Sequence, residues 1–215
     1  MRDFNLYAIT CFRKDKGFVE QLRLAIKGGA DIVQLRASGI TDKEFIKAAK
    51  KIKTLAVKNR VLFIINNRVD IAFLVGADGV HLGQDDMSVT EAREISGARK
   101  KILIGVSTHS MKQAIKGEKE GADYISVGPV FSTVTKPDYK PVGLGLVAKV
   151  KGKIKVPFVA IGGINKGNLK AVLKAGATRI AVVREICGAE DITGAARQVK
   201  QYLLGSLDNS NRRRR

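Results

Sequence analysis

Residues 127–143 lead from an apolar run to the start of a helix-like pattern, and four polar side chains follow the Gly-Pro pair within seven residues. They are Ser132, Thr133, Thr135 and Lys136. Hydroxyls are short hydrogen-bond donors and the lysine adds a positive charge, which is the combination that binds a phosphate group. The segment therefore predicts a phosphate site. Taken alone, it would also fit a solvated loop.

Polar side chains also stand at the ends of other apolar runs. Gln34 and Arg36 close the second run, and because they are two residues apart they share one face of a strand. Asp85 and Asp86 follow the fourth run, where their oxygens would suit Mg²⁺, or where they would begin a helix as its N-terminal acids. The other candidates are Asn66, Asn67, His81, Ser107, His109, Gly163, Val183 and Arg184.

Eight apolar, β-branched runs alternate with helix-like segments and have the composition of strands that are buried on both faces. The helix-like segments carry apolar stripes, and two of them begin with the spacing of a capping box, at residues 41–44 and 88–91. The predicted strands are residues 6–10, 32–36, 61–66, 79–82, 102–107, 124–130, 158–161 and 179–183.

A Gly-Ala-Asp triplet occurs at residues 29–31, 76–78 and 121–123, with Gly-Ala-Thr at 176–178. Each glycine stands where a helix should end, and each interval holds two strand–helix units. Eight units predict an α/β fold of the (β/α)8 TIM barrel type, and their number within 215 residues favours it over an open doubly wound sheet. All polar strand ends then share the rim where such barrels bind ligands and phosphate groups.

The two histidines differ in position. His81 lies within its run and is typical of a hydrogen-bonded core histidine, whereas His109 follows its run and is the better candidate for catalysis. Cys11 and Cys187 have no metal-ligand spacing, and in a closed barrel they should lie near each other past neighbouring strand ends. We expect both thiols to be reduced.

The chain is strongly basic, with a formal net charge of +19. Such charge attracts phosphorylated small molecules or nucleic acid, but 6% aromatic residues without tryptophan do not suit base stacking, so we do not expect nucleic acid as a partner. No apolar run is long enough for a membrane span, and the first residues lead directly into a strand without a signal-peptide pattern. We expect a cytoplasmic barrel domain over residues 1–207 and a disordered basic tail over 208–215, and leave open whether it is a homo-oligomer.

The motifs stand in the order of a known family. QLR after the second strand, HLGQDD after the fourth, GVS and a His after the fifth, T-x-T-K after the sixth and AIGGI at the seventh resemble thiamine-phosphate synthase over residues 6–202. The resemblance implies a (β/α)8 transferase that joins a hydroxymethylpyrimidine diphosphate to a thiazole phosphate and releases pyrophosphate, with Mg²⁺ as cofactor.

The resemblance also implies roles for single residues. Arg36, Lys136 and Ser107 would be catalytic, with Arg36, Lys136 and Mg²⁺ neutralising the charge on the departing pyrophosphate so that the thiazole nitrogen adds to the pyrimidine CH₂. The pyrimidine diphosphate would be held by Gln34, Arg36, Asn66, Ser107 and Lys136, the thiazole phosphate by Thr133, Thr135, Gly163, Val183 and Arg184, and magnesium by Asp86 and Asn67.

Two positions depart from the family pattern. Asn67 stands where a magnesium-binding Asp is usual, and Ser38 stands in the diphosphate site where a Lys is usual. An amide offers Mg²⁺ a carbonyl oxygen without the charge, and Asp85 or Lys136 would have to compensate. The departures leave two alternatives open. One is a related thiazole tautomerase that uses His109 and no metal, and the other is a non-catalytic phosphate-binding barrel.

Overall fold

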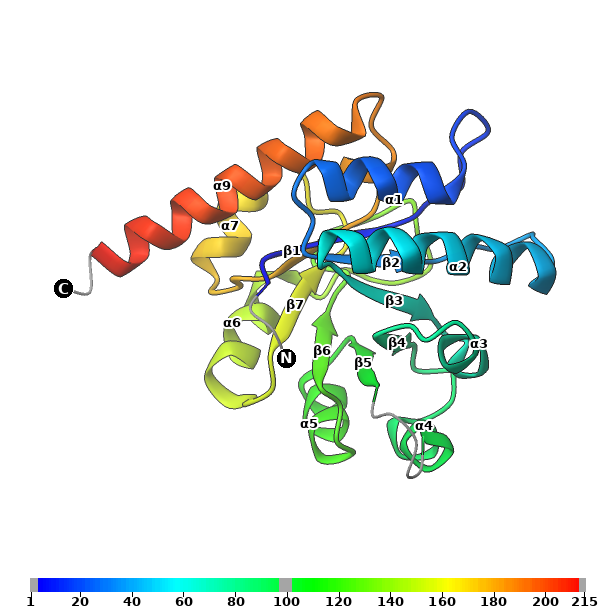
Figure 1. The fold of residues 1–215 in the computed structure, drawn as a ribbon. Helices are drawn as coiled ribbons and strands as arrows, with labels where there is room; N and C mark the ends of the chain where they lie inside the picture. Colours follow the sequence, from blue (N-terminus) through cyan, green and yellow to red (C-terminus); the bar gives the residue numbers. More distant parts are fainter. Residues whose placement is uncertain (1–3, 97–101, 213–215) are drawn as a thin grey trace.

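The computed structural model describes residues 4–96 and 102–212, and it contains a closed barrel of eight parallel strands (Figure 1). The strands pair in chain order, and β1 closes the barrel against β8 through partners such as Leu6 and Ile180. The predicted (β/α)8 barrel is confirmed, and the open sheet is wrong. The strands are β1 (Leu6–Ile9), β2 (Ile32–Leu35), β3 (Leu62–Asn66), β4 (Gly79–Leu82), β5 (Leu103–Thr108), β6 (Tyr124–Val127), β7 (Phe158–Ile161) and β8 (Ile180–Val182).

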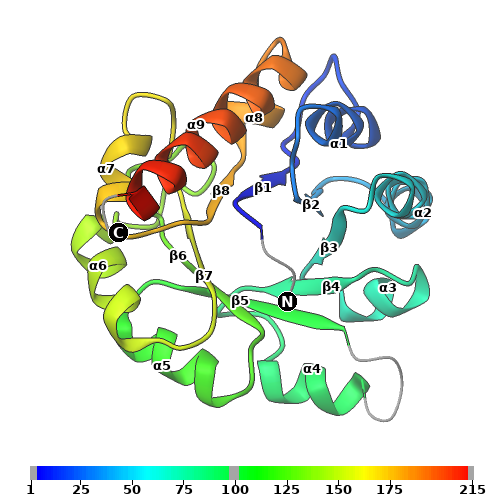
Figure 2. The ribbon, with the colours of Figure 1, turned by 60° about the vertical axis from the view of Figure 1, so that its left-hand side comes forward.

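Helices surround the barrel on its outside (Figure 2). They pack through the predicted apolar stripes, as in α2, which buries Phe45, Ala49, Ile52 and Ala56. In the described part of the chain, no helix is long and apolar enough to cross a membrane. The helices are α1 (Phe18–Lys27), α2 (Asp42–Asn59), α3 (Val69–Leu74), α4 (Val89–Ser96), α5 (Met111–Lys119), α6 (Gly143–Lys153), α7 (Leu169–Lys174), α8 (Arg184–Cys187) and α9 (Ile192–Arg212).

One predicted boundary needs correction. Strand β6 ends at Val127 rather than at residue 130, because Pro129 has no N–H group to continue the ladder. The N–H groups of Val130 and Phe131 instead donate to the carbonyls of residues 161 and 162, at 2.8 and 3.0 Å, and bind the β6–α6 loop to the end of β7.

Helix α9 extends to Arg212 and so includes the backbone of residues 208–212. The basic tail over residues 208–215 stays a prediction. Nothing in the segment from Leu207 to Arg212 is a proline or glycine that would end the helix. Residues 213–215 lie outside the described residues.

The Gly-Ala-Asp triplets tie neighbouring strands together at the amino-terminal rim of the barrel. The four glycines of the repeat adopt φ between 63° and 104°, which suits glycine, and each leads the chain from a helix into a strand. Asp78 accepts hydrogen bonds from the N–H of Phe63 at 2.9 Å and from the ammonium of Lys53 at 2.8 Å. Asp31 likewise accepts from Leu6 and Lys200, and Asp123 from Ile104 and Arg93.

Inward-facing side chains fill the barrel. Tyr7, Ile64, Tyr124 and Val159 are among the members of this inner apolar cluster, while the outward-facing side chains pack under the helices. A Cβ on Gly105 would lie 2.1 Å from the ring of Tyr124, so only glycine leaves room for this tyrosine. The inner cluster forms the floor beneath the carboxyl-terminal rim.

The two cysteines follow neighbouring strands, as predicted. Arg13, two residues after Cys11, donates to the carbonyls of Cys187 at 3.4 Å and Ala189 at 2.5 Å, so the loops after β1 and β8 are joined. Both thiols are free, and burial raises the pKa of each.

Candidate active site

A cavity of about 620 Å³ lies at the carboxyl ends of the strands. The residues proposed for the site from the sequence line it, apart from Asp85 and Ser132. They come from seven of the eight βα connections and strand ends. Asp85 does not line the cavity, although its charge acts on Lys136, which does. The residues brought together are Gln34, Arg36, Ser38, Asn66, Asn67, His81, Asp86, Ser107, His109, Thr133, Thr135, Lys136, Gly163, Val183 and Arg184.

Arg36 brings one positive charge to the cavity. Its backbone is held by Thr10, whose hydroxyl oxygen accepts from the Arg36 N–H at 2.8 Å and donates to the Arg36 carbonyl at 2.7 Å. Among the described residues, no carboxylate or other acceptor pairs with its guanidinium group. The charge is therefore available to a ligand.

Lys136 brings a second positive charge. Its ammonium lies 5.0 Å from the ring centre of Tyr139, and no described carboxylate forms an ion pair with it. Burial lowers the pKa of Lys136, and the nearby charge of Arg36 lowers it further, against weaker opposing effects of Asp86 and Asp85. Two half-buried cations that repel each other favour an anion between them.

The β6–α6 loop and the glycines after β7 form a second part of the cavity. The Thr133 hydroxyl accepts from the N–H of Thr135 at 3.3 Å, which turns the loop. Gly162 and Gly163 adopt φ of 96° and 65°, and a Cβ on Gly163 would lie 2.5 Å from the carbonyl oxygen of Ser132. The N–H of Gly163 has no acceptor among the described residues, which leaves it as a donor for a phosphate.

Asp86 and Asn67 face the cavity from neighbouring strand ends. One carboxylate oxygen of Asp86 accepts from the N–H of Gly83 at 2.6 Å, and its other oxygen has no donor among the described residues. Asn67 adopts φ of 63°, a region that Asn and Asp tolerate better than most residues, and its N–H donates to the His81 carbonyl at 2.9 Å. No group of three or more His, Cys, Asp or Glu side chains within the described ranges could hold a metal. The Asp86 carboxylate and the Asn67 amide each offer an oxygen atom, which is the ligand type that Mg²⁺ takes in proteins.

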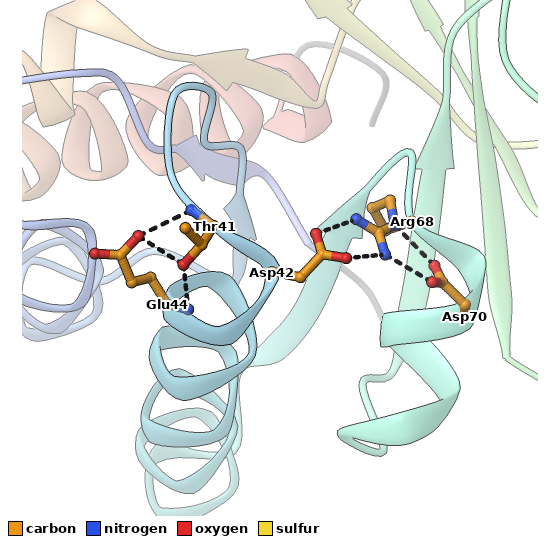
Figure 3. A network of polar contacts seen from close by, with 5 residues as sticks. All are labelled: Thr41, Asp42, Glu44, Arg68 and Asp70. Carbon is orange, nitrogen blue, oxygen red and sulfur yellow. Dashed lines mark hydrogen bonds and ion pairs between the residues drawn. The ribbon is translucent and has the colours of Figure 1, made fainter.

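Arg68, the residue after Asn67, forms ion pairs with Asp42 and Asp70 (Figure 3). Its guanidinium donates to Asp42 at 2.7 and 3.2 Å and to Asp70 at 3.0 and 2.7 Å, which links the first turns of α2 and α3. These bonds, first to Asp70 and then to Asp42, raise the pKa of Arg68. Beside it, Thr41 and Glu44 form the predicted capping box at the start of α2. Arg68 is thus neutralised within the chain and does not line the cavity.

A chain of polar side chains lies under the cavity. Gln34 Nε2 donates to the Tyr7 hydroxyl at 2.6 Å, which lies 3.1 Å from the Tyr124 hydroxyl. His81 Nδ1 lies 3.0 Å from the Tyr124 hydroxyl, and Nε2 lies 3.0 Å from the Ser107 hydroxyl and 3.4 Å from that of Ser126. His81 is thus a satisfied core histidine, as predicted, but it also lines the cavity floor.

His109, directly after the end of β5, also lines the cavity. Its Nδ1 is hydrogen-bonded to the Gly128 carbonyl, and because a carbonyl only accepts, Nδ1 carries the proton. Nε2 of a neutral ring is then an acceptor. The ring lies 4.7 Å from that of Tyr139.

Several lining residues were missed in the sequence. Phe12 and Arg13 follow β1, and Tyr7 lies within it. Arg13 is paired with Asp15, while Phe12 is 72% exposed beside the cavity. The segment Cys11-Phe12-Arg13 could have been found by treating the end of the first strand like the others, whereas Tyr7 resembles any core aromatic residue.

These features define a class of (β/α)8 barrels with a cationic cavity for anionic ligands at the carboxyl ends of the strands. The sequence profile of the family described as thiamine monophosphate synthase matches residues 6–186. The chain belongs to this family.

Individual relatives extend the match to nearly the full length. A thiamine-phosphate synthase of Halalkalibacterium halodurans is 48% identical over 197 residues, which are 90% of this chain and 92% of that protein. One of Shouchella clausii is 42% identical over 98% of this chain and all of that protein. The structure of thiamine phosphate pyrophosphorylase from Pyrococcus furiosus superposes with a TM-score of 0.88 at 39% identity, covering 95% of this chain and 97% of that one.

Proposed function

We propose that this chain is a thiamine-phosphate synthase, a transferase that joins a pyrimidine methyl diphosphate to a thiazole phosphate. The observation that carries the proposal is the pair of cations without counter-ions, Arg36 and Lys136, in a cavity that also holds hydroxyl and N–H donors. Membership of the family and the names of the full-length relatives support the same reaction.

In this proposal the diphosphate binds between Arg36 and Lys136, with Ser107 and Asn66 as further donors and Gln34 beside the pyrimidine. The bond between the pyrimidine CH₂ and the diphosphate oxygen breaks, and its electron pair leaves with pyrophosphate. Fixed cations stabilise the charge that grows on the leaving group, and such stabilisation commonly lowers the barrier more than any other single effect. The thiazole nitrogen then forms the new carbon–nitrogen bond.

The thiazole phosphate binds at the second part of the cavity. Thr133, Thr135 and the backbone N–H groups of Gly163, Val183 and Arg184 donate to its oxygens, as helix starts and backbone turns do for phosphates elsewhere. Ser38 also lines the cavity. In this proposal it offers the diphosphate a hydroxyl but no charge.

Asp86 and Asn67 would hold Mg²⁺ in this proposal, through a carboxylate and an amide oxygen. When bound there, the ion would add positive charge at the diphosphate. Asp86 has an oxygen without a donor in the described structure, and Asn67 lines the same cavity. Because only one of the two side chains is charged, we expect the ion to bind chiefly together with the diphosphate.

The test is a turnover assay with both substrates and Mg²⁺, which follows thiamine phosphate and pyrophosphate. We expect both products in equal amounts, and neither when one substrate is left out. No product with both substrates present would reject the synthase and support a non-catalytic phosphate-binding barrel. We infer that the protein acts in the cytoplasm on phosphorylated small molecules. Its two free thiols agree with this, because disulfides are rare in that compartment.

A second function is kept because of His109. Its Nε2 is an acceptor in the cavity and could take a proton from a thiazole phosphate. A thiazole tautomerase would isomerise the thiazole phosphate alone, in the presence of a chelator. Incubation with the thiazole phosphate alone distinguishes the two functions, because only a tautomerase would convert it. We expect the thiazole phosphate to remain unchanged.

A further inference from the structure

The polar chain under the cavity joins five strands and reaches the cavity at both ends. Gln34 lies on β2, Tyr7 on β1, Tyr124 on β6, His81 on β4 and Ser107 on β5. Both end residues, Gln34 and Ser107, line the cavity. The direction in which the hydrogen bonds run therefore decides what each end offers to a ligand.

All members of the chain are neutral near pH 7. Burial raises the pKa of both Tyr7 and Tyr124, so each phenol keeps its proton. Burial, and then the charge of Lys136, lowers the pKa of His81 to about 4, so its ring carries one proton. Each hydroxyl and the ring thus has one proton to donate, and the hydrogen bonds must all run in one direction.

The amide of Gln34 sets this direction. Its Nε2 can only donate, so the Tyr7 oxygen accepts and the Tyr7 proton is directed to Tyr124. The Tyr124 proton is then donated to His81 Nδ1, the only other described partner of that hydroxyl. The ring proton must therefore be on Nε2, where it is donated to the Ser107 oxygen.

The two ends of this hydrogen-bonded chain of side chains, Ser107 and Gln34, now have defined roles. Ser107 accepts from His81, so its own proton is free to be donated into the cavity, where Arg36 and Lys136 also lie. Gln34 donates one of its two Nε2 protons to Tyr7, and its Oε1 accepts from no described residue. The Ser107 end is a donor for an anion, and the Gln34 end offers an acceptor oxygen and one remaining N–H to an amine or hydroxyl of the ligand.

We propose that Tyr7, Tyr124 and His81 are positioning residues that fix Ser107 as a donor to the diphosphate and Gln34 as an acceptor for the heterocycle. The identity of the ligand in this role rests on the proposed function. The direction in which the hydrogen bonds run does not. In the opposite direction, Ser107 would donate to His81 and turn only lone pairs toward the anion.

The test is the tautomer of His81, measured by long-range ¹H–¹⁵N NMR on the full ligand-free chain. The chain has two histidines, so in the variant His109→Gln every histidine signal comes from His81. We expect the Nε2–H tautomer, without titration between pH 6 and pH 9. A ring with its proton on Nδ1, or a charged ring, overturns the proposal. Because no substrate is used, this outcome is independent of whether the turnover assay succeeds.

Tyr124→Phe tests the coupling between the chain and the site. The phenylalanine keeps the ring but removes the donor to Nδ1, so neither tautomer is favoured and the ¹⁵N shifts should move toward their average. We expect kcat to fall by about tenfold, the effect of about one lost hydrogen bond to a charged ligand, with little change in KM.

Tyr202→Phe is the matched control. This tyrosine lies on α9, is 41% exposed and does not line the cavity. It should leave both the ¹⁵N shifts and kcat unchanged. If the shifts of His81 in Tyr124→Phe equal those of the wild type, Tyr124 does not set the tautomer and the proposed coupling is wrong.

Discussion

The two rims of the barrel use the same residue types in opposite ways. At the amino-terminal rim, Lys53 lies 2.8 Å from Asp78, and the same carboxylate accepts from a strand N–H. At the carboxyl-terminal rim, Lys136 and Arg36 have no such partner among the described residues, and burial lowers the pKa of Lys136. A cation that is paired holds strands together, whereas a cation without a partner is available to a ligand.

This difference separates stability from activity. Removing a partner at the amino-terminal rim leaves a buried N–H or a charge unsatisfied and lowers the free energy of unfolding. Removing a half-buried cation at the carboxyl-terminal rim relieves repulsion in the free protein and harms only the liganded state. Substitutions at the two rims should therefore have separable effects.

The largest effect is expected at Lys136. Lys136→Ala should lower kcat/KM by about 10²- to 10³-fold, the range seen when one preorganised donor to a developing charge is lost. The free energy of unfolding, measured with urea, should stay the same or rise. Lys140→Ala, in the same loop but outside the cavity, is the control and should keep full activity. Near-normal turnover of Lys136→Ala would remove Lys136 from the site.

Between the rims, the buried His81 should make stability depend on pH. Its pKa is lowered to about 4 from the usual 6.5, so the unfolded chain takes up the proton first as the pH falls. The contribution of neutral His81 to the free energy of unfolding is complete above pH 6.5. It is lost as the pH falls toward 4, by about 3 kcal/mol in total. Unfolding of wild type and His81→Gln between pH 4 and pH 7 measures it. A difference in stability between them that does not shrink at low pH would contradict the assignment.

At the amino-terminal rim, Asp78→Ala should lower the free energy of unfolding by about 2 kcal/mol. The substitution leaves the N–H of Phe63 without its acceptor and Lys53 without its partner. Because the residue is distant from the cavity, kcat and KM of the folded protein should not change. A loss of activity without a loss of stability would show that the two rims are not independent.

A smaller effect is expected at Asn67. Asn67→Asp restores a charge beside Asp86 and should strengthen apparent Mg²⁺ affinity by about tenfold, or about 1.4 kcal/mol, without strain, because Asp also tolerates positive φ. Asp86→Asn should lower the apparent Mg²⁺ affinity below that of the wild type. Turnover is measured as a function of Mg²⁺ for the three proteins. Full activity of the wild type in the presence of a chelator would show that turnover needs no Mg²⁺ at this site.

The sequence predicts the framework better than the interior. Continuous β-branched runs locate the strands, and those of β4 and β7 agree with the structure at both ends. Because the barrel closes in chain order, every polar strand end is brought to one cavity, including pairs as distant as Arg36 and Arg184. The roles of these residues stay predictions.

The interior is harder to predict because it depends on pairing across the barrel. Tyr7 and Tyr124 are 117 positions apart, and nothing local distinguishes them from core aromatic residues. The pairing of Arg68 with Asp42 also depends on how α2 and α3 pack.

The difference between the rims is tested most directly by calorimetric titration of pyrophosphate in the presence of Mg²⁺. Wild type, Lys136→Gln and Lys53→Gln are compared, since both variants lose one positive charge from a chain of net charge +19. We predict that Lys136→Gln weakens binding at least tenfold, while Lys53→Gln stays within about twofold of wild type and loses only stability. Equal weakening in both variants would mean that overall charge binds the anion, and would contradict a built site at the carboxyl-terminal rim.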